Sequence, residues 1–169
     1  MDQLSEIKDF PNVLSINRKR EAIRSFFKSK TTEFLQPFAF TLTLKQVLPA
    51  LRIRLTPELA KQNCRHFLNV LNYKLFGKAY QRHGKRVKVV AVLEWSPGER
   101  YHYHGLMDCP AALDLYTLPD VVCDSWRKTQ WGYHEAEIIP AYDRVGWLNY
   151  ITKQSDLAEA IDWENCVIS

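Results

Sequence analysis

The fold of this chain is decided by residues 87–108, which read VKVVAVLEWSPGERYHYHGLMD. Two apolar runs flank a short turn segment that contains Pro97 and Gly98. Apolar runs separated by a Pro-Gly turn of this kind are typical of a β-hairpin. If the turn is centred on Gly98, Glu94 pairs directly with His102. The segment therefore predicts two antiparallel strands with a fixed register.

This register gathers three polar side chains on one face of the hairpin. Residues two apart on a strand point to the same side, so the imidazoles of His102 and His104 face one way. Glu94 joins them, because directly opposed residues have Cβ atoms about 5 Å apart. The sequence also places Val90, Val92 and Leu106 on this face, and Val89, Ala91, Leu93, Trp95, Tyr101, Tyr103 and Met107 on the opposite one.

Two imidazoles and a carboxylate form a three-ligand metal site with open positions. Taken alone, the pair His102 and His104 has a simpler interpretation, in which the histidines are ordinary hydrogen-bonding residues. Glu94 favours the metal site, because an ionised carboxylate on an apolar hairpin is costly to bury without a partner. A divalent cation satisfies all three groups together, and the sequence therefore predicts one here.

The rest of the chain alternates between helices and strands. The patterns predict helices over 12–35, from the N-cap Thr56 to near Gly77, over 118–130 and over Asp143–Gln154 with its N-cap at Tyr142 or Asp143. They predict strands over Phe38–Lys45, Val87–Trp95, Tyr101–Asp108 and Tyr133–Ile139. Hairpin-linked strands mixed with helices indicate an α+β fold, with a central antiparallel sheet of about five strands flanked by helices.

Composition is consistent with one compact domain over 1–169, in which 1–35 is a helical extension packed on the rest. The 4 cysteines show no C-x-x-C spacing and are interpreted as free thiols of a reducing compartment. The acidic N-terminus does not resemble a secretory signal, and no apolar stretch approaches the length of a membrane span. We therefore expect a soluble, cytoplasmic or host-cell intracellular protein that is a monomer.

The last predicted helix contains Tyr150 and Lys153. Residues three apart share one helix face, so we expect the phenol and the ammonium to be neighbours. Tyrosine is a poor nucleophile at its free pKa near 10 and needs activation, which a nearby cation can supply. Considered alone, these two residues are better interpreted as a core tyrosine beside a surface lysine.

Together, the three motifs resemble those of the HUH endonucleases, in particular the replication-initiator (Rep) branch with one catalytic tyrosine in a Y-x-x-K motif. Glu94, the H-Y-H pair and the run from Tyr150 to Asp156 follow the family's order across most of the chain. Residues 40–43 (FTLT) are similar to the family's first motif, without its usual following Tyr-Pro. The middle residue of the H-Y-H motif is Tyr103, where the family generally has an apolar residue.

The resemblance implies a function and roles for these residues. Glu94, His102 and His104 would hold Mn²⁺ or Mg²⁺, and Tyr150 would attack the scissile phosphate of single-stranded DNA. The product would be a covalent 5′-phosphotyrosine with a free 3′-hydroxyl, as in sequence-specific nicking and joining at the start of rolling-circle replication. Lys153 would stabilise developing charge or orient a water molecule. Gln154 and Asp156 are candidate accessory residues.

The expected partner is single-stranded DNA, at an origin or a hairpin. Basic residues cluster over 18–30 and 82–88, and such patches are compatible with nucleic-acid binding, although they are equally typical of solvated surfaces. Trp126, Trp131 and Trp147 are candidate stacking rings but are better interpreted as core residues. The candidate DNA-binding residues are Thr41, Thr43, Lys45, Arg52, Arg54, Lys85 and Arg86, with Arg18 and Arg20 as further basic candidates.

No Walker A pattern occurs, so we expect no helicase domain, and a separate helicase would have to unwind the duplex. Three other interpretations stay open. Tyr150 and Gln154 also fit the Y-x-x-x-Q spacing of single-tyrosine HUH transposases. The predicted ligands would also suit a metal-dependent hydrolase or a non-haem iron oxygenase unrelated to DNA. A non-catalytic DNA-binding module of the same fold would have no need for the tyrosine.

Overall fold

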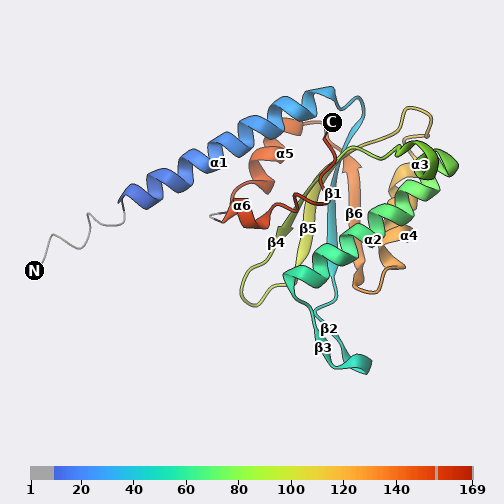
Figure 1. The fold of residues 1–169 in the computed structure, drawn as a ribbon, viewed down its shortest axis with the longest axis horizontal. Helices are drawn as coiled ribbons and strands as arrows, with labels where there is room; N and C mark the ends of the chain where they lie inside the picture. The colour runs from blue at the N-terminus through green and yellow to red at the C-terminus, as the bar shows by residue number, and fades with distance from the viewer. Residues whose placement is uncertain (1–9, 155, 169) are drawn as a thin grey trace, which may run out of the picture.

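The computed structural model describes residues 10–154 and 156–168. Its helices lie on both faces of one antiparallel sheet (Figure 1). The strands are β1 (Pro37–Leu44), β2 (Val47–Leu48), β3 (Ile53–Arg54), β4 (Val89–Glu94), β5 (His102–Asp108) and β6 (Gly132–Pro140). The α-helices are α1 (Phe10–Lys30), α2 (Pro57–Phe76), α3 (Lys78–His83), α4 (Thr117–Arg127), α5 (Arg144–Ile151) and α6 (Leu157–Ala160), and short 3₁₀ helices cover Thr31–Glu33 and Pro49–Leu51.

The α+β prediction is confirmed, and the sheet has four strands in the order β4-β5-β1-β6. We expected about five. The segment after β1 instead leaves the sheet as a separate two-stranded ribbon, β2–β3, which projects from the body (Figure 1). The hairpin has the predicted register, since Glu94 pairs with His102 and Val92 with His104. β1 pairs with β5 on the other side, and Thr41 stands opposite His104.

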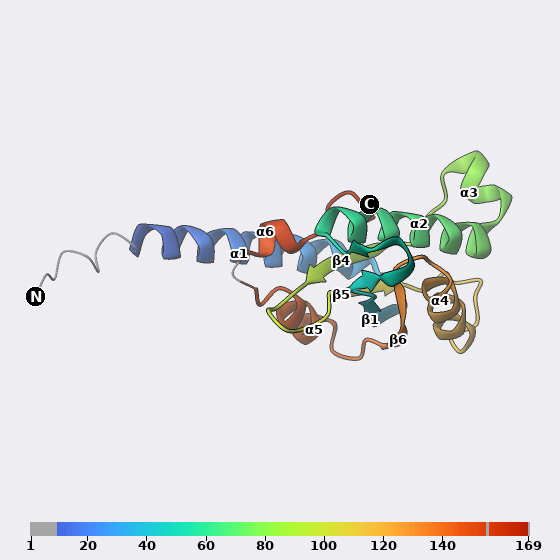
Figure 2. The same cartoon turned by 90° about the horizontal axis from the view of Figure 1, so that it is seen from below.

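Two hydrophobic cores lie on the two faces of the sheet, as the alternation of the hairpin predicted. One core joins Val90, Val92 and Leu106 to α1, α5 and α6. The other joins the opposite face to α2 and α4, and Trp126 and Trp131 are buried in it. Figure 2 shows the sheet enclosed between these layers. The sheet is therefore covered on both faces, which explains why both faces of the hairpin are apolar.

The C-terminal segment covers the outer edge of the sheet. Val167 and Ile161 form bridges to β4, which would otherwise expose unpaired backbone groups. The buried Tyr103 points away from the two histidines and donates a hydrogen bond to Asp162, with 2.8 Å between Oη and Oδ2. A tyrosine is therefore accommodated in the middle of the H-Y-H motif, because its hydroxyl has a buried acceptor.

Several element boundaries differ from the prediction. The first helix ends at Lys30 rather than 35, because Thr31–Glu33 tightens into a 3₁₀ turn. The short elements α3, α6, β2 and β3 were not predicted. Thr56 caps α2 and Asp143 caps α5, as expected. Among the described residues, no helix is long and apolar enough to cross a membrane.

Gly105 provides a test of this packing. It pairs with Phe40 across β1 and β5, and a Cβ atom added to it would overlap the Phe40 ring and the carbonyl oxygen of Val90. We expect Gly105→Ala to lower the free energy of unfolding by about 1–3 kcal/mol, as overpacking of a core does. Denaturant unfolding measures this change.

The double variant with Phe40→Leu serves as the control. Because the smaller side chain removes one of the two overlaps, the double variant should lose less stability than the sum of the two single variants. A change below about 0.5 kcal/mol for Gly105→Ala, typical of surface sites, would contradict the described packing.

Candidate active site

The hairpin brings Glu94, His102 and His104 together at one end of the sheet. One ligand atom from each residue can be chosen so that all lie within 4.8 Å of one another. Glu94 Oε2 lies 3.0 Å from His104 Nε2 and 3.8 Å from His102 Nε2. Glu94 and His104 are buried, and His102 is partly exposed. A carboxylate and two imidazoles that converge in this way form a donor set able to hold a divalent cation.

The second nitrogen of each imidazole is held by a neighbouring group. His102 Nδ1 lies 2.8 Å from the carbonyl oxygen of Arg100, which can only accept a hydrogen bond. Nδ1 therefore carries the proton, and the neutral ring leaves a lone pair on Nε2, on the side of Glu94. His104 Nδ1 lies 3.0 Å from Thr41 Oγ1. Outer hydrogen bonds of this kind orient histidine ligands in metal sites.

The charge state of His104 suits the same role. Burial lowers its pKa to about 4, and the neighbouring His102 lowers it further than the carboxylate of Glu94 can offset. His104 is therefore neutral at pH 7, and a metal ion binds only the neutral imidazole.

Helix α5 carries Tyr150 to the edge of this cluster. Asp143 begins the helix by accepting a hydrogen bond from the Gly146 amide at 2.8 Å, a standard N-cap. The Tyr150 ring lies 5.5 Å from the His104 ring between centroids, and its side chain is 45% exposed. The phenol therefore stands beside the presumed ligands and is open to solvent, which contradicts the simple interpretation of a core tyrosine.

Trp147 fixes the position of Tyr150 relative to the sheet. Its Nε1 donates to the Gly105 carbonyl oxygen at 2.8 Å, directly after His104 on β5. Its ring stacks on Tyr150 with 5.3 Å between centroids. From the sequence, Trp147 was expected to be a core residue or a stacking ring for DNA. The structure shows that it joins the tyrosine helix to the histidine strand.

Lys153 reaches the site by a different route from the one predicted. The helix was expected to continue to Gln154, but α5 ends at Ile151, so Lys153 lies beyond it rather than on the Tyr150 face. The Thr152 hydroxyl ends the helix by donating to the Leu148 carbonyl oxygen at 2.6 Å. The chain then turns, and Lys153 Nζ lies 4.0 Å from the Tyr150 ring centroid and 3.3 Å from Glu94 Oε1.

The two contacts of Lys153 have an electrostatic effect. Partial burial alone would lower the pKa of the ammonium, but contacts with Tyr150 and Glu94 outweigh this and raise the pKa above its ordinary value. Lys153 thus stays charged between the phenol and the carboxylate. Gln154 follows it, partly exposed, and Asp156 is exposed at the start of α6.

The predicted DNA-binding residues fall into separate groups. Thr41 and Thr43 lie on the site face of β1 opposite His104 and His102, and Thr41 is already bonded to an imidazole. Arg52 and Arg54 lie at the projecting ribbon. Lys85 and Arg86 precede β4, at the opposite end of that strand from Glu94, about 25 Å along an extended chain.

A cleft of about 520 Å³ adjoins the site end of the sheet. Lys45 and Arg100 line it together with Tyr133, and the guanidinium of Arg100 lies 4.4 Å from the centroid of the Tyr133 ring. Sequence reasoning missed Arg100 and Tyr133 as functional candidates. Arg100 stands in the turn directly before the histidines, but its position over an aromatic ring depends on β6, which is distant in sequence.

Comparison with known proteins places this geometry in a family. Residues 37–155 match the family model of the ORF2-type replication-associated proteins. The chain belongs to this family. No curated protein and no solved structure matched the chain. The matched segment of this replication-associated protein runs from the first residue of β1 past Lys153, so it includes the three presumed ligands and Tyr150 but not α1.

A metal titration tests the cluster. Mn²⁺ at 100 times its dissociation constant should stabilise the folded protein by about 2.7 kcal/mol, because it binds only the folded site. Glu94→Gln and His102→Ala should lose this stabilisation, since each removes one of three ligands. Thermal unfolding with and without Mn²⁺ measures the effect. His66→Ala, which removes an exposed histidine on α2, should keep the full response, and an equal loss in this control would contradict the assignment.

Proposed function

We propose that this protein is an endonuclease that nicks and rejoins single-stranded DNA at the initiation of replication. The observation that carries the proposal is the placement of an exposed phenol, Tyr150, against an imidazole of a Glu-His-His cluster, with the Lys153 ammonium at its ring. Membership of a replication-associated family supports a role in initiation. The nucleophile, the metal and the DNA substrate are the proposed parts.

In the proposed reaction, the Tyr150 oxygen attacks the phosphorus of the scissile phosphodiester. The bond from phosphorus to tyrosine forms as the bond to the 3′-oxygen breaks, and the phenolic proton is lost. The products are a 5′-phosphotyrosine and a free 3′-hydroxyl. The reverse attack by a 3′-hydroxyl rejoins DNA, because the phosphodiester energy is kept in the covalent link.

Glu94, His102 and His104 would hold the cation that assists this step. When bound, a divalent cation supplies Lewis-acid polarisation of a phosphate oxygen. The mixed imidazole and carboxylate set suits Mn²⁺ better than Mg²⁺, which prefers oxygen ligands alone. The hydrogen bonds with the Arg100 carbonyl and the Thr41 hydroxyl hold both rings with Nε2 turned toward Glu94, so little reorganisation is needed on binding.

Lys153 has two tasks in this proposal. Its ammonium, close to both Tyr150 and Glu94, favours the negative charge that develops on the phenol oxygen and the phosphate. Its position beyond the end of α5 also leaves the side chain 46% exposed, so it can reach a bound phosphate. A fixed cation beside the nucleophile is the activation that a phenol requires.

Single-stranded DNA is the proposed substrate, bound along the cleft at the site end of the sheet. Arg100 and Lys45 supply positive charge, and the Tyr133 ring offers a face near that charge. A basic groove lined with aromatic faces is the usual surface for single strands. At an origin the duplex must be opened first, so a separate helicase is the expected partner.

The replication family favours an initiator over a single-tyrosine transposase. It also favours DNA chemistry over a His/Glu metal enzyme of another class. Lys153 occupies the place beside Glu94 and Tyr150, which agrees with the Y-x-x-K interpretation of the motif.

The nucleophile is tested with a labelled single-stranded oligonucleotide library and Mn²⁺. Wild type should form a covalent adduct that survives denaturing electrophoresis, and Tyr150→Phe should form none, because the attacking oxygen is gone. Tyr142→Phe, which removes the hydroxyl of a 94% exposed tyrosine two residues after β6, should behave like wild type. An adduct retained by Tyr150→Phe would sink the assignment.

The binding surface is tested by salt dependence. Affinity for a single strand should fall linearly with salt on logarithmic axes, with a slope of about −0.7 per neutralised phosphate. Arg100→Ala should weaken binding and make this slope shallower by about that amount. Arg82→Ala, which removes the same charge from α3, should leave the slope unchanged. Equal slopes for wild type and Arg100→Ala would exclude Arg100 from the DNA contact.

A further inference from the structure

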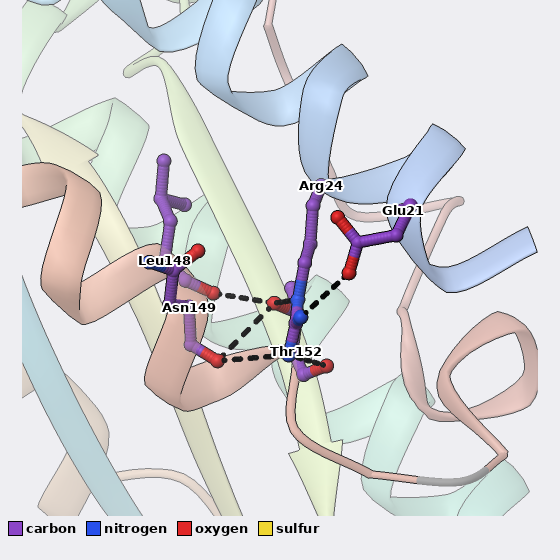
Figure 3. A network of polar contacts seen from close by, with 5 residues as sticks. All are labelled: Glu21, Arg24, Leu148, Asn149 and Thr152. Atoms are coloured by element: carbon purple, nitrogen blue, oxygen red, sulfur yellow. Dashed lines mark hydrogen bonds and ion pairs between the residues drawn. The ribbon is translucent and has the colours of Figure 1, made fainter. Parts of the chain in front are cut away.

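Helix α1 makes a polar contact with the C-terminal end of the tyrosine helix. Arg24 Nε donates to Thr152 Oγ1 at 2.9 Å, and one terminal nitrogen donates to the Thr152 carbonyl oxygen at 3.2 Å and lies 3.4 Å from that of Asn149 (Figure 3). The other terminal nitrogen pairs with Glu21 at 2.9 Å. One guanidinium therefore contacts three acceptors around the last turn of α5.

This arrangement satisfies groups that a helix end leaves unpaired. The last carbonyls of an α-helix have no partner within the helix, and a positive charge near them also complements the helix dipole. Thr152 is fully buried, and its hydroxyl both accepts from Arg24 and donates to the Leu148 carbonyl oxygen. The planar fork of the guanidinium fixes direction as well as distance.

A second contact holds the other end of α5 to the same N-terminal segment. Arg144, the first residue of α5, donates to the carbonyl oxygen of the buried Thr31 at 2.6 Å. Between these two ends, the fully buried Phe27 of α1 lies in the core that contains Leu148 and Ile151. Helix α5 is thus fixed at both ends and along its buried face by residues that precede the segment matched by the family model.

We infer that Arg24 is a positioning residue for the nucleophile, an inference that rests on the proposed function of Tyr150. Arg24 bonds Thr152, which lies between Tyr150 and Lys153 in the chain. The backbone held by Arg24 sets both the end of the helix that carries the phenol and the turn that returns the ammonium to it. Arg24 itself contacts neither phosphate nor metal ligands in this role.

The expected effect is on the rate of bond formation rather than on DNA affinity. A displacement of about 1 Å in a reacting group can cost 100-fold in rate. Arg24→Ala should therefore lower the single-turnover rate of adduct formation by roughly 10- to 100-fold. The dissociation constant for the oligonucleotide should stay within about twofold, because the residue lies behind α5 and outside the cleft.

Glu21→Gln is the matched control. It removes the exposed ion pair of Arg24 but leaves the contacts of the guanidinium with Thr152 and Asn149. Because exposed pairs contribute little, this variant should keep the wild-type rate. Arg24→Lys keeps the charge without the fork and should recover only part of the rate.

Thr152→Val tests the contact from the other side. It keeps the side-chain shape but removes the hydroxyl that accepts from Arg24. If the two residues act through one hydrogen bond, the double variant should lose less than the product of the two single losses in rate. Independent, multiplicative losses would show that the hydrogen bond does not carry the effect.

A spectroscopic measurement decides the inference without any activity. The chain has 8 tyrosines, and the Tyr150 signal in ¹⁹F NMR of fluorotyrosine-labelled protein is identified by its loss in Tyr150→Phe. In folded Arg24→Ala this signal should shift or broaden, whereas in Glu21→Gln it should stay in place. If Arg24→Ala does not fold, Arg24→Lys and Thr152→Val supply the same comparison.

The two hypotheses fail in different ways. An unchanged Tyr150 signal and an unchanged rate in Arg24→Ala would overturn the positioning role, even with an active wild type. A wild type that forms no adduct with any single strand would overturn the proposed function, and the ¹⁹F signal would still show whether Arg24 orders the tyrosine helix.

Discussion

The pairing of Glu94 with His102 is the constraint on which the site depends. Side chains alternate along a strand, so a slip of one residue between β4 and β5 would send the carboxylate to the opposite face, into the core formed with α2 and α4. The two cores prevent such a slip, because Val90, Val92 and Leu106 would leave theirs at the same time. Hydrophobic burial on both faces of the sheet therefore fixes the geometry of a polar cluster.

The cluster in turn depends on neighbours that hold its polar groups in one arrangement. A buried carboxylate beside two imidazoles is stable only if charges and hydrogen bonds are satisfied. The carbonyl of Arg100 and the hydroxyl of Thr41 hold the outer nitrogens, and Lys153 balances the charge of Glu94. The same ammonium contacts Tyr150, so the group that offsets the carboxylate also prepares the phenol.

The sequence was sufficient for whatever depends on local alternation and turn chemistry. It predicted the hairpin, both of its faces, the α+β class and the caps Thr56 and Asp143, because each follows from residues close together in the chain. It did not predict that α5 stops at Ile151 or that Arg100 lies over Tyr133, because these depend on contacts between distant segments. The basic pair at 85–86 was grouped with the site by charge alone, and the fold places it at the far end of β4.

Helix α5 shows why the orientation of the tyrosine could not be derived from its own sequence. A helix of 8 residues is too short to be stable in isolation, so its position must come from tertiary contacts. The sheet supplies one contact through Trp147 and Gly105, and α1 supplies the others through Arg24, Phe27 and Thr31. Metal ligands and nucleophile lie inside the segment shared with the replication-associated family, whereas the helix that orders the nucleophile lies outside it. It follows that a chain with the same sheet and motifs but a different N-terminal segment would need another way to hold its tyrosine in place.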